Sequence, residues 1–97
     1  MKTIYEIKTI INFNRKVLEN HFKVKAFGVF GSYVRGQQKI RSDIDILVEF
    51  SEPVDLIQFI ELENYLADKL GKKVDIVTRN ALKPFIGKCI LEEVVYV

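Results

Sequence analysis

The chain has 97 residues, of which 48% are hydrophobic, and carries 15 Lys and Arg against 13 Asp and Glu. This length predicts one domain, and a net charge of +2 is too small to indicate nucleic acid as a bulk partner. We find no apolar run near the roughly 20 residues that cross a bilayer and no secretory segment, so we expect no membrane association. The single cysteine, Cys89, cannot form an internal disulfide, which favours a cytoplasmic location.

The first third of the chain predicts a helix, a strand and a short second helix. Hydrophobic residues at helical spacing indicate an amphipathic helix over residues 3–20. The β-favouring run Val24–Phe30 predicts a buried strand that stops at Gly31. Ser32 is a suitable N-cap for a short helix through about Gln37, because its hydroxyl can accept a hydrogen bond from a backbone N–H.

A second strand is predicted over Asp43–Phe50. Side chains alternate along a strand, so Asp43 and Asp45 project from one face, about 7 Å apart along the backbone. Two neighbouring carboxylates repel each other unless a cation lies between them, and hard divalent cations prefer oxygen ligands. The pair therefore predicts a divalent-cation site. The opposite face is apolar and carries Ile44, Ile46, Val48 and Phe50.

Next along the chain, a longer helix is predicted after Pro53. Asp55 and Gln58 have the spacing of a capping box, and Gly71 is a suitable C-terminal end. We expect its buried stripe to contain Leu56, Phe59, Ile60, Leu66 and Leu70.

The last part of the chain predicts a third strand and a final helix. The strand Lys73–Thr78 places Asp75 on the face opposite its inward residues. Pro84 suits the first turn of the final helix. The tail Val94–Val97 is unusually apolar for a chain end and indicates a surface for a partner.

These elements predict an α/β (α+β) fold with the order α-β-α-β-α-β-α in one domain over residues 1–97. The second and third strands are joined through a full helix, which favours a parallel, right-handed crossover. The short link between the first two strands permits an antiparallel pair, so we expect a small mixed sheet. The face carrying Asp43, Asp45 and Asp75 is expected to be partly open to solvent, because three unpaired carboxylates are costly to bury.

The acidic face and the glycine–serine turn together suit nucleotidyl transfer. Gly31 lacks a Cβ and lets phosphate approach closely, and backbone N–H groups follow it. Asp43 and Asp45 are placed to hold two metal ions, and Asp75 to complete one metal shell or accept the attacking hydroxyl's proton. Arg35 is suited to contact a phosphate or to brace the turn through a carboxylate. Ser42 is suited to cap the turn before the second strand or to contact metal or phosphate.

The segments GSYVRG (31–36), SDIDILV (42–48) and KVDIVT (73–78) resemble those of the minimal nucleotidyltransferases of the DNA polymerase β superfamily. The resemblance covers nearly the whole chain, including the ending LEEVVYV. It implies a polymerase β-type fold and an Mg²⁺-dependent enzyme using ATP or another NTP. It also implies that Gly31 and Ser32 bind phosphate, that Asp43 and Asp45 are metal ligands, and that Asp75 is the third catalytic acid.

The resemblance further implies the antitoxin half of a toxin–antitoxin pair. The implied partner is a HEPN-type RNase toxin, and better-understood members of the family inactivate it by adding AMP to a tyrosine. We therefore predict a protein adenylyltransferase that forms a hetero-oligomer with its toxin. The alternative is an antitoxin of the same fold that neutralises its partner by binding alone. No aromatic–basic platform indicates direct binding to nucleic acid.

Overall fold

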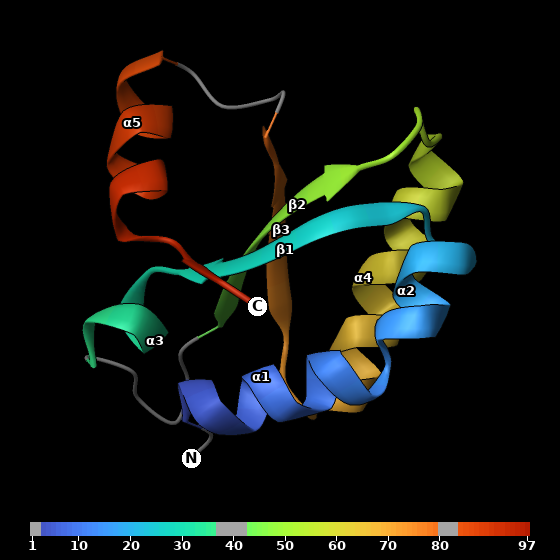
Figure 1. Cartoon of the computed structure of the whole chain (residues 1–97), viewed down its shortest axis with the longest axis horizontal. Coiled ribbons are helices and arrows are strands. Elements are labelled where there is room, and N and C mark those ends of the chain that lie inside the picture. Colours follow the sequence, from blue (N-terminus) through green and yellow to red (C-terminus); the bar gives the residue numbers. More distant parts are fainter. Residues whose placement is uncertain (1–2, 37–42, 80–83) are drawn as a thin grey trace.

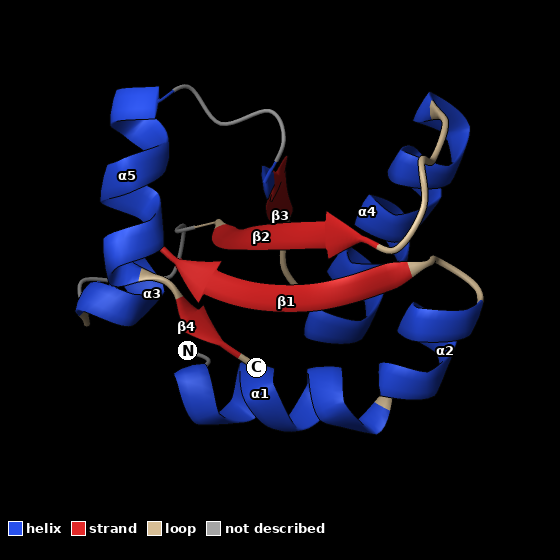
Figure 2. Ribbon diagram, turned by 45° about the horizontal axis from the view of Figure 1, so that its top comes forward, coloured by secondary structure: helices blue, strands red, loops and turns tan. Residues whose placement is uncertain are grey.

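The computed structural model describes residues 3–36, 43–79 and 84–97, without the side chains of residues 84–87 and 89. Within these ranges a four-stranded mixed sheet has the order β3-β2-β1-β4, with β1 antiparallel to β2 and β4, and β2 parallel to β3 (Figure 2). The predicted mixed sheet is thus confirmed. The elements are α1 (Ile4–Phe13), α2 (Arg15–Asn20), β1 (Val24–Phe30), α3 (Ser32–Arg35), β2 (Ile44–Phe50), α4 (Leu56–Leu70), β3 (Val74–Thr78), α5 (Pro84–Glu93) and β4 (Val95–Tyr96).

The N-terminal segment forms two helices and not the single helix predicted, because the helix is interrupted at Asn14. The Asn14 side-chain amide donates to the carbonyl of Ile10 at 2.8 Å, and its amide oxygen accepts the hydroxyl of Tyr65 at 2.8 Å. Asparagine side chains that bond nearby backbone groups compete with continuous helix. The bond to Tyr65 of α4 also fixes the corner at which the two helices meet.

One face of the sheet carries the hydrophobic core. Ile44, Ile46 and Val48 of β2 have no exposed surface, and β1 and β3 add apolar residues in register with them. Helices α1, α2 and α4 cover this face, and Figure 1 shows α2 and α4 together beside the end of the sheet away from α5. The face that the sequence predicted to be apolar, with Ile44 and Ile46, is therefore the buried one. The helical core residues are Ile7, Ile11, Leu18, Leu62, Leu66 and Leu70.

The buried stripe of α4 differs from the predicted one. Leu66 and Leu70 are buried as expected, and Leu62 joins them. Leu56 is 72% exposed and Ile60 is 46% exposed, so their assignment to the core is wrong. Leu56 lines an open groove with Val48 and Phe50 and does not pack into the core cluster.

We expect Asp55→Ala to lower the free energy of unfolding by about 1 kcal/mol. The Asp55 carboxylate accepts the N–H of Gln58 at 2.8 Å, and the Gln58 side chain accepts the N–H of Asp55 at 3.0 Å, so the capping box is confirmed. Urea titration should show a lower midpoint at unchanged slope. Glu61→Ala, at an exposed position of the same helix, should change stability by less than about 0.5 kcal/mol. Equal losses in both variants would contradict the assigned cap.

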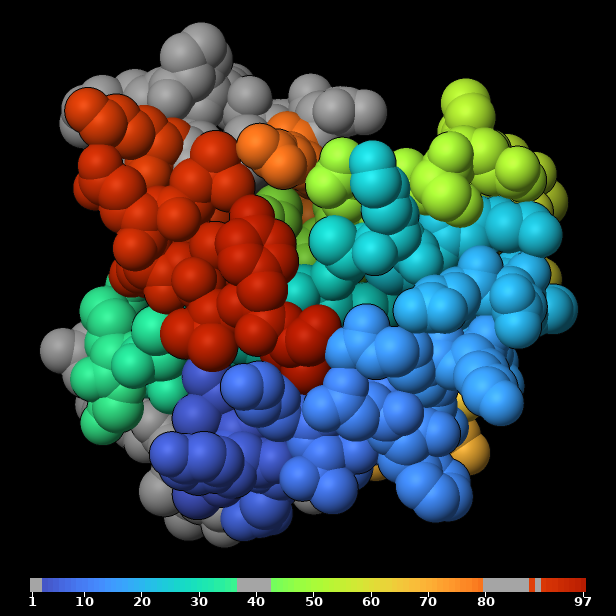
Figure 3. Space-filling view, viewed as in Figure 1, coloured from blue at the N-terminus to red at the C-terminus, as the bar shows by residue number. Residues whose placement is uncertain are grey.

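The C-terminal tail completes the sheet. Strand β4 pairs with residues 28 and 29 of β1, and the N–H of Val97 donates to the carbonyl of Phe27 at 2.9 Å. Gly28 permits this approach, because a Cβ there would overlap the side chain of Val94. Figure 3 shows the C-terminal segment, in red, lying against α1 in blue and α3 in green. This pairing corrects the interpretation of the tail as a surface left for a partner.

Candidate active site

Three acidic side chains lie at the sheet face opposite the core. Asp45 of β2 and Asp75 of β3 are direct partners in the parallel register, on strands that lie about 4.8 Å apart. Asp43 immediately precedes β2, two positions before Asp45, and so projects from the same face. Asp75 is exposed, and Asp43 and Asp45 are half-buried. The expectation of an acidic face partly open to solvent is confirmed.

The three carboxylates act on one another electrostatically. Burial raises the pKa of Asp45 above its ordinary value of 3.8, and repulsion from Asp75 and then Asp43 raises it further. Arg35 lowers the pKa of Asp45, whereas Glu93 raises it. A carboxylate with two like-charged neighbours is stabilised in its ionised form by an added cation. A bound cation would therefore lower the pKa of Asp45 by offsetting the repulsion from Asp75 and Asp43.

The turn after β1 has an unusual backbone. Gly31 has φ 79° and ψ −149°, a combination that is essentially restricted to glycine. Its carbonyl accepts the N–H groups of Val34 and Arg35 at 3.1 and 3.2 Å, which begins α3. Gly31 thus occupies the N-cap position, without a side-chain cap. The prediction that Ser32 caps this helix is wrong, because Ser32 is already its first residue.

Helix α3 is also shorter than predicted. It ends at Arg35, and the N–H of Gly36 donates to the carbonyl of Ser32 to close its single turn. The predicted end near Gln37 lies outside the described residues, as does Ser42, for which a metal or phosphate contact was one of two expectations.

The glycine turn lies directly against the acidic face. Phe30 and Asp45 are partners in the antiparallel register of β1 and β2, which places Gly31 next to Asp45. A Cβ added to Gly31 would overlap the carboxylate of Asp45. The turn and the acids were predicted from the sequence to form one site, and the fold brings Gly31 and Asp45 together.

Arg35 braces the turn through a carboxylate, one of its two predicted roles. Its guanidinium Nη1 lies 3.1 Å from Oε2 and 3.3 Å from Oε1 of Glu93, at the end of α5. Oε1 of Glu93 also accepts the N–H of Gly31 at 2.7 Å. Figure 1 shows α3 and the C-terminal end of α5 side by side next to the end of β1. Glu93 was not predicted as a site residue, since nothing in the local sequence pattern distinguishes it from other helix acids.

The donor set fits a hard divalent cation, although no ligand shell is already assembled. Among the described residues, no three His, Cys, Asp or Glu side chains are close enough together to hold a metal ion as they stand. The carboxylates of Asp45 and Asp75 are nevertheless neighbours on adjacent strands, and their repulsion is the kind that magnesium relieves. To bind a metal ion together, the side chains of Asp45 and Asp75 would have to rotate so that their carboxylates converge.

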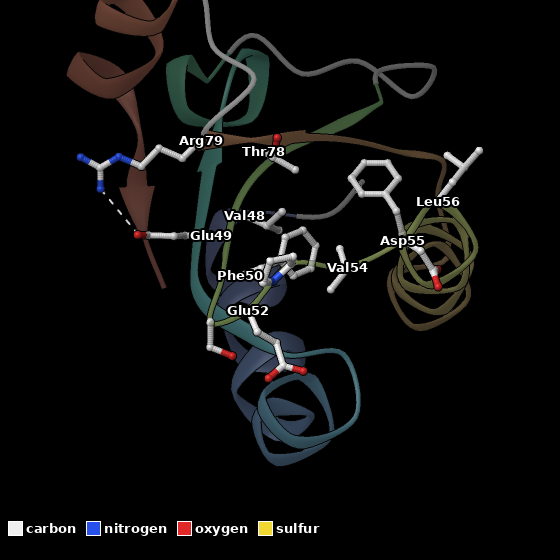
Figure 4. A pocket seen from close by; sticks show the side chains of 12 residues that line it. Val48, Glu49, Phe50, Glu52, Val54, Asp55, Leu56, Thr78 and Arg79 are labelled. Carbon is white, nitrogen blue, oxygen red and sulfur yellow. Dashed lines mark ion pairs between the residues drawn. The ribbon is translucent and has the colours of Figure 1, made fainter.

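A groove of about 610 Å³ lies at the other end of β2. It lies between the chain that follows β2 and the start of α4, with Phe50, Val54 and Phe59 among its lining residues (Figure 4). An ion pair between Glu49 and Arg79 at 3.6 Å borders it. The groove is remote along β2 from Asp43 and Asp45, so it is separate from the acidic face.

A small mixed sheet with facing strand carboxylates beside a glycine–serine turn defines a nucleotidyltransferase-type site. The chain belongs to the nucleotidyltransferase domain family, whose model matches residues 7–97.

Named relatives make this placement more specific. The protein adenylyltransferase MntA of Thermococcus cleftensis is 52% identical over 97 residues, which is 100% of this chain and 98% of the relative. A toxin–antitoxin crystal structure with AMP-PNP aligns with a TM-score of 0.74 at 29% identity, covering 93% of this chain and 70% of that one. A complex of a tri-AMPylated Shewanella oneidensis HEPN toxin with an MNT antitoxin aligns at 0.68 and 25% identity, with the same coverage.

Proposed function

We propose that this protein is an Mg²⁺-dependent protein adenylyltransferase that moves AMP from ATP to a tyrosine of a cognate HEPN-type toxin, and so acts as its antitoxin. One structural observation carries the proposal: the carboxylate of Asp45 lies against the Gly31 turn and faces Asp75 across the parallel strand pair. The similarity to the Thermococcus adenylyltransferase and to the AMP-PNP-bound and AMPylated complexes supports the nucleotide, the reaction and the partner.

In this proposal Asp43, Asp45 and Asp75 hold magnesium. Bound there, magnesium supplies neutralisation of the triphosphate charge and polarisation of the attacking hydroxyl. The oxygen donors fit a hard cation, and the raised pKa of Asp45 reflects crowding that such a cation relieves. Asp75 is the most exposed of the three acids, which suits either completion of a metal shell or acceptance of the hydroxyl proton.

The Gly31–Ser32 turn receives the triphosphate in this proposal. The absence of a Cβ at Gly31 lets the Asp45 carboxylate lie against the turn, and Ser32 follows with its N–H and hydroxyl. The tyrosine oxygen then attacks the α-phosphorus, an O–P bond forms to AMP, and the bond to pyrophosphate breaks. Pyrophosphate leaves with the negative charge, and the tyrosine proton passes to Asp75 or to solvent.

The direct test is incubation of the purified protein with its cognate toxin, Mg²⁺ and α-labelled ATP. We expect label on the toxin and intact-mass increases in steps of one AMP, and we expect EDTA to abolish both. Omission of the antitoxin is the control. A toxin of unchanged mass after co-expression with the active antitoxin would contradict the proposal.

A second candidate is neutralisation by binding alone. The observation in its favour is an apolar patch on the first turns of α4, where Leu56, Ile57 and Ile60 are 72%, 69% and 46% exposed. Exposed aliphatic patches of this kind are typical of protein interaction surfaces. One variant distinguishes the two candidates. Asp45→Asn leaves this patch intact but removes the proposed metal ligand, so it should abolish catalysis without affecting neutralisation by binding.

We also propose that the protein acts in the cytoplasm, where ATP and an RNase toxin both occur. No helix among the described residues has the length and apolar character to cross a bilayer. Fractionation of cells that express a tagged chain would test the location, and recovery with the membrane pellet would contradict it.

A further inference from the structure

Glu93 links the last helix of the chain to the glycine turn. One carboxylate oxygen accepts the N–H of Gly31 at 2.7 Å, and both oxygens lie within 3.3 Å of Arg35 Nη1. The Glu93 side chain is 27% exposed and that of Arg35 is 51% exposed. The ion pair alone therefore contributes little to stability, because both partners are partly exposed to solvent. The charge-assisted bond to Gly31 is the stronger of the two contacts.

The Gly31 peptide groups are held from both sides. Its N–H is held by Glu93, and its carbonyl accepts N–H groups from Val34 and Arg35 of α3. A glycine with φ 79° and ψ −149° has many other conformations open to it. Among the described residues, the other hydrogen bonds to Gly31 all come from the α3 side of the turn. The orientation of Ser32, the next residue, depends on the bonds that hold Gly31.

We infer that Glu93 is a positioning residue for nucleotide binding, which holds the Gly31–Ser32 turn in the conformation that receives phosphate. The inference rests on the proposed function of the same turn. Glu93 is 62 residues from Gly31 along the chain, and its carboxylate accepts hydrogen bonds from Gly31 and Arg35. Arg35 balances its negative charge, so that a carboxylate so near the turn does not repel an incoming triphosphate.

The inference predicts graded losses of affinity for AMP-PNP with Mg²⁺, measured by calorimetry below the melting temperature of each variant. Glu93→Ala removes both contacts and should weaken binding about tenfold or more. Glu93→Gln keeps an oxygen that can accept the N–H of Gly31 and should lose only about two- to threefold. Glu92→Ala is the matched control, since Glu92 is the neighbouring acid of α5 and is exposed.

A merely structural role for Glu93 would lower the melting temperature and leave the affinity of the folded protein unchanged. Binding by Glu93→Ala within twofold of wild type, or tighter than wild type, therefore overturns the inference. If Glu93→Ala does not fold, the AMP-PNP affinities of Glu93→Asp and Glu93→Gln test the inference instead. The shortened carboxylate of Glu93→Asp should bind AMP-PNP more weakly than Glu93→Gln, and any other order overturns the inference.

The same measurement separates this inference from the proposed function. A wild-type protein that does not bind AMP-PNP with Mg²⁺ would contradict the proposed ATP site, and the role of Glu93 with it. Wild-type binding with no loss in Glu93→Ala would contradict the positioning role alone and leave the proposed ATP site standing.

Discussion

Asp45→Asn should abolish AMP transfer to the toxin while leaving the metal-free protein at least as stable as wild type. The substitution removes one negative charge from the proposed magnesium site, so we expect the transfer rate to fall by about 1,000-fold or more. The same substitution removes the repulsion that Asp45 experiences from Asp75 and Asp43. Transfer is measured with labelled ATP, and stability by thermal unfolding in EDTA.

A loss of stability in the Asp45→Asn variant would show that the carboxylate serves the fold rather than the site. Asp68→Asn is the matched control, because Asp68 lies on the exposed face of α4 away from the acids. It should change neither transfer nor stability. If Asp45→Asn still protected cells from the toxin, the result would favour neutralisation by binding alone.

The difference in stability between Asp45→Asn and wild type should depend on pH. The pKa of Asp45 is raised in the folded protein, so between the unfolded and folded pKa values the native state holds more protons than the unfolded state. Stability attributable to Asp45 is therefore highest below the unfolded pKa and is lost as the pH rises through the folded value. In EDTA, the advantage of Asp45→Asn over wild type should grow as the pH rises above about 4. A constant advantage across that range would contradict the cause given for the raised pKa.

Gly31→Ala should have the second large effect, because it damages both the fold and the site. An alanine at φ 79° and ψ −149° is strained by about 1–3 kcal/mol, and its Cβ would overlap the Asp45 carboxylate. We expect a total loss of about 3 kcal/mol or more in the free energy of unfolding. Affinity for AMP-PNP should fall below detection, because the added methyl group would displace the Asp45 carboxylate and distort the proposed phosphate-binding turn. Urea unfolding and calorimetry measure the two effects.

Gly71→Ala separates the two causes of this loss. Gly71 has φ 67°, but an added Cβ would meet no atom within 4 Å. It should therefore show the cost of the left-handed backbone alone, about 1 kcal/mol, with nucleotide affinity unchanged. If Gly31→Ala costs no more than Gly71→Ala, the overlap with Asp45 is not the reason for glycine at the turn.

Local patterns were sufficient for β1, β2 and β3 and for the cap of α4. The alternation in Ile44–Phe50 predicted which face carries Asp45, and Asp55 with Gln58 predicted the start of α4. These features depend on residues two or three positions apart, and backbone geometry alone relates them. The break at Asn14 was missed because a bond from Tyr65, distant along the chain, helps to create it.

The sequence by itself therefore determined that two strands present acids on one face and that a glycine–serine turn ends the first strand, because side-chain alternation and turn chemistry act over a few residues. Only the tertiary structure decided that the tail forms β4, that Leu56 and Ile60 remain exposed, and that Glu93 holds Gly31. These outcomes depend on which surfaces meet after the chain has folded, and partners 62 residues apart leave no local signal of their contact.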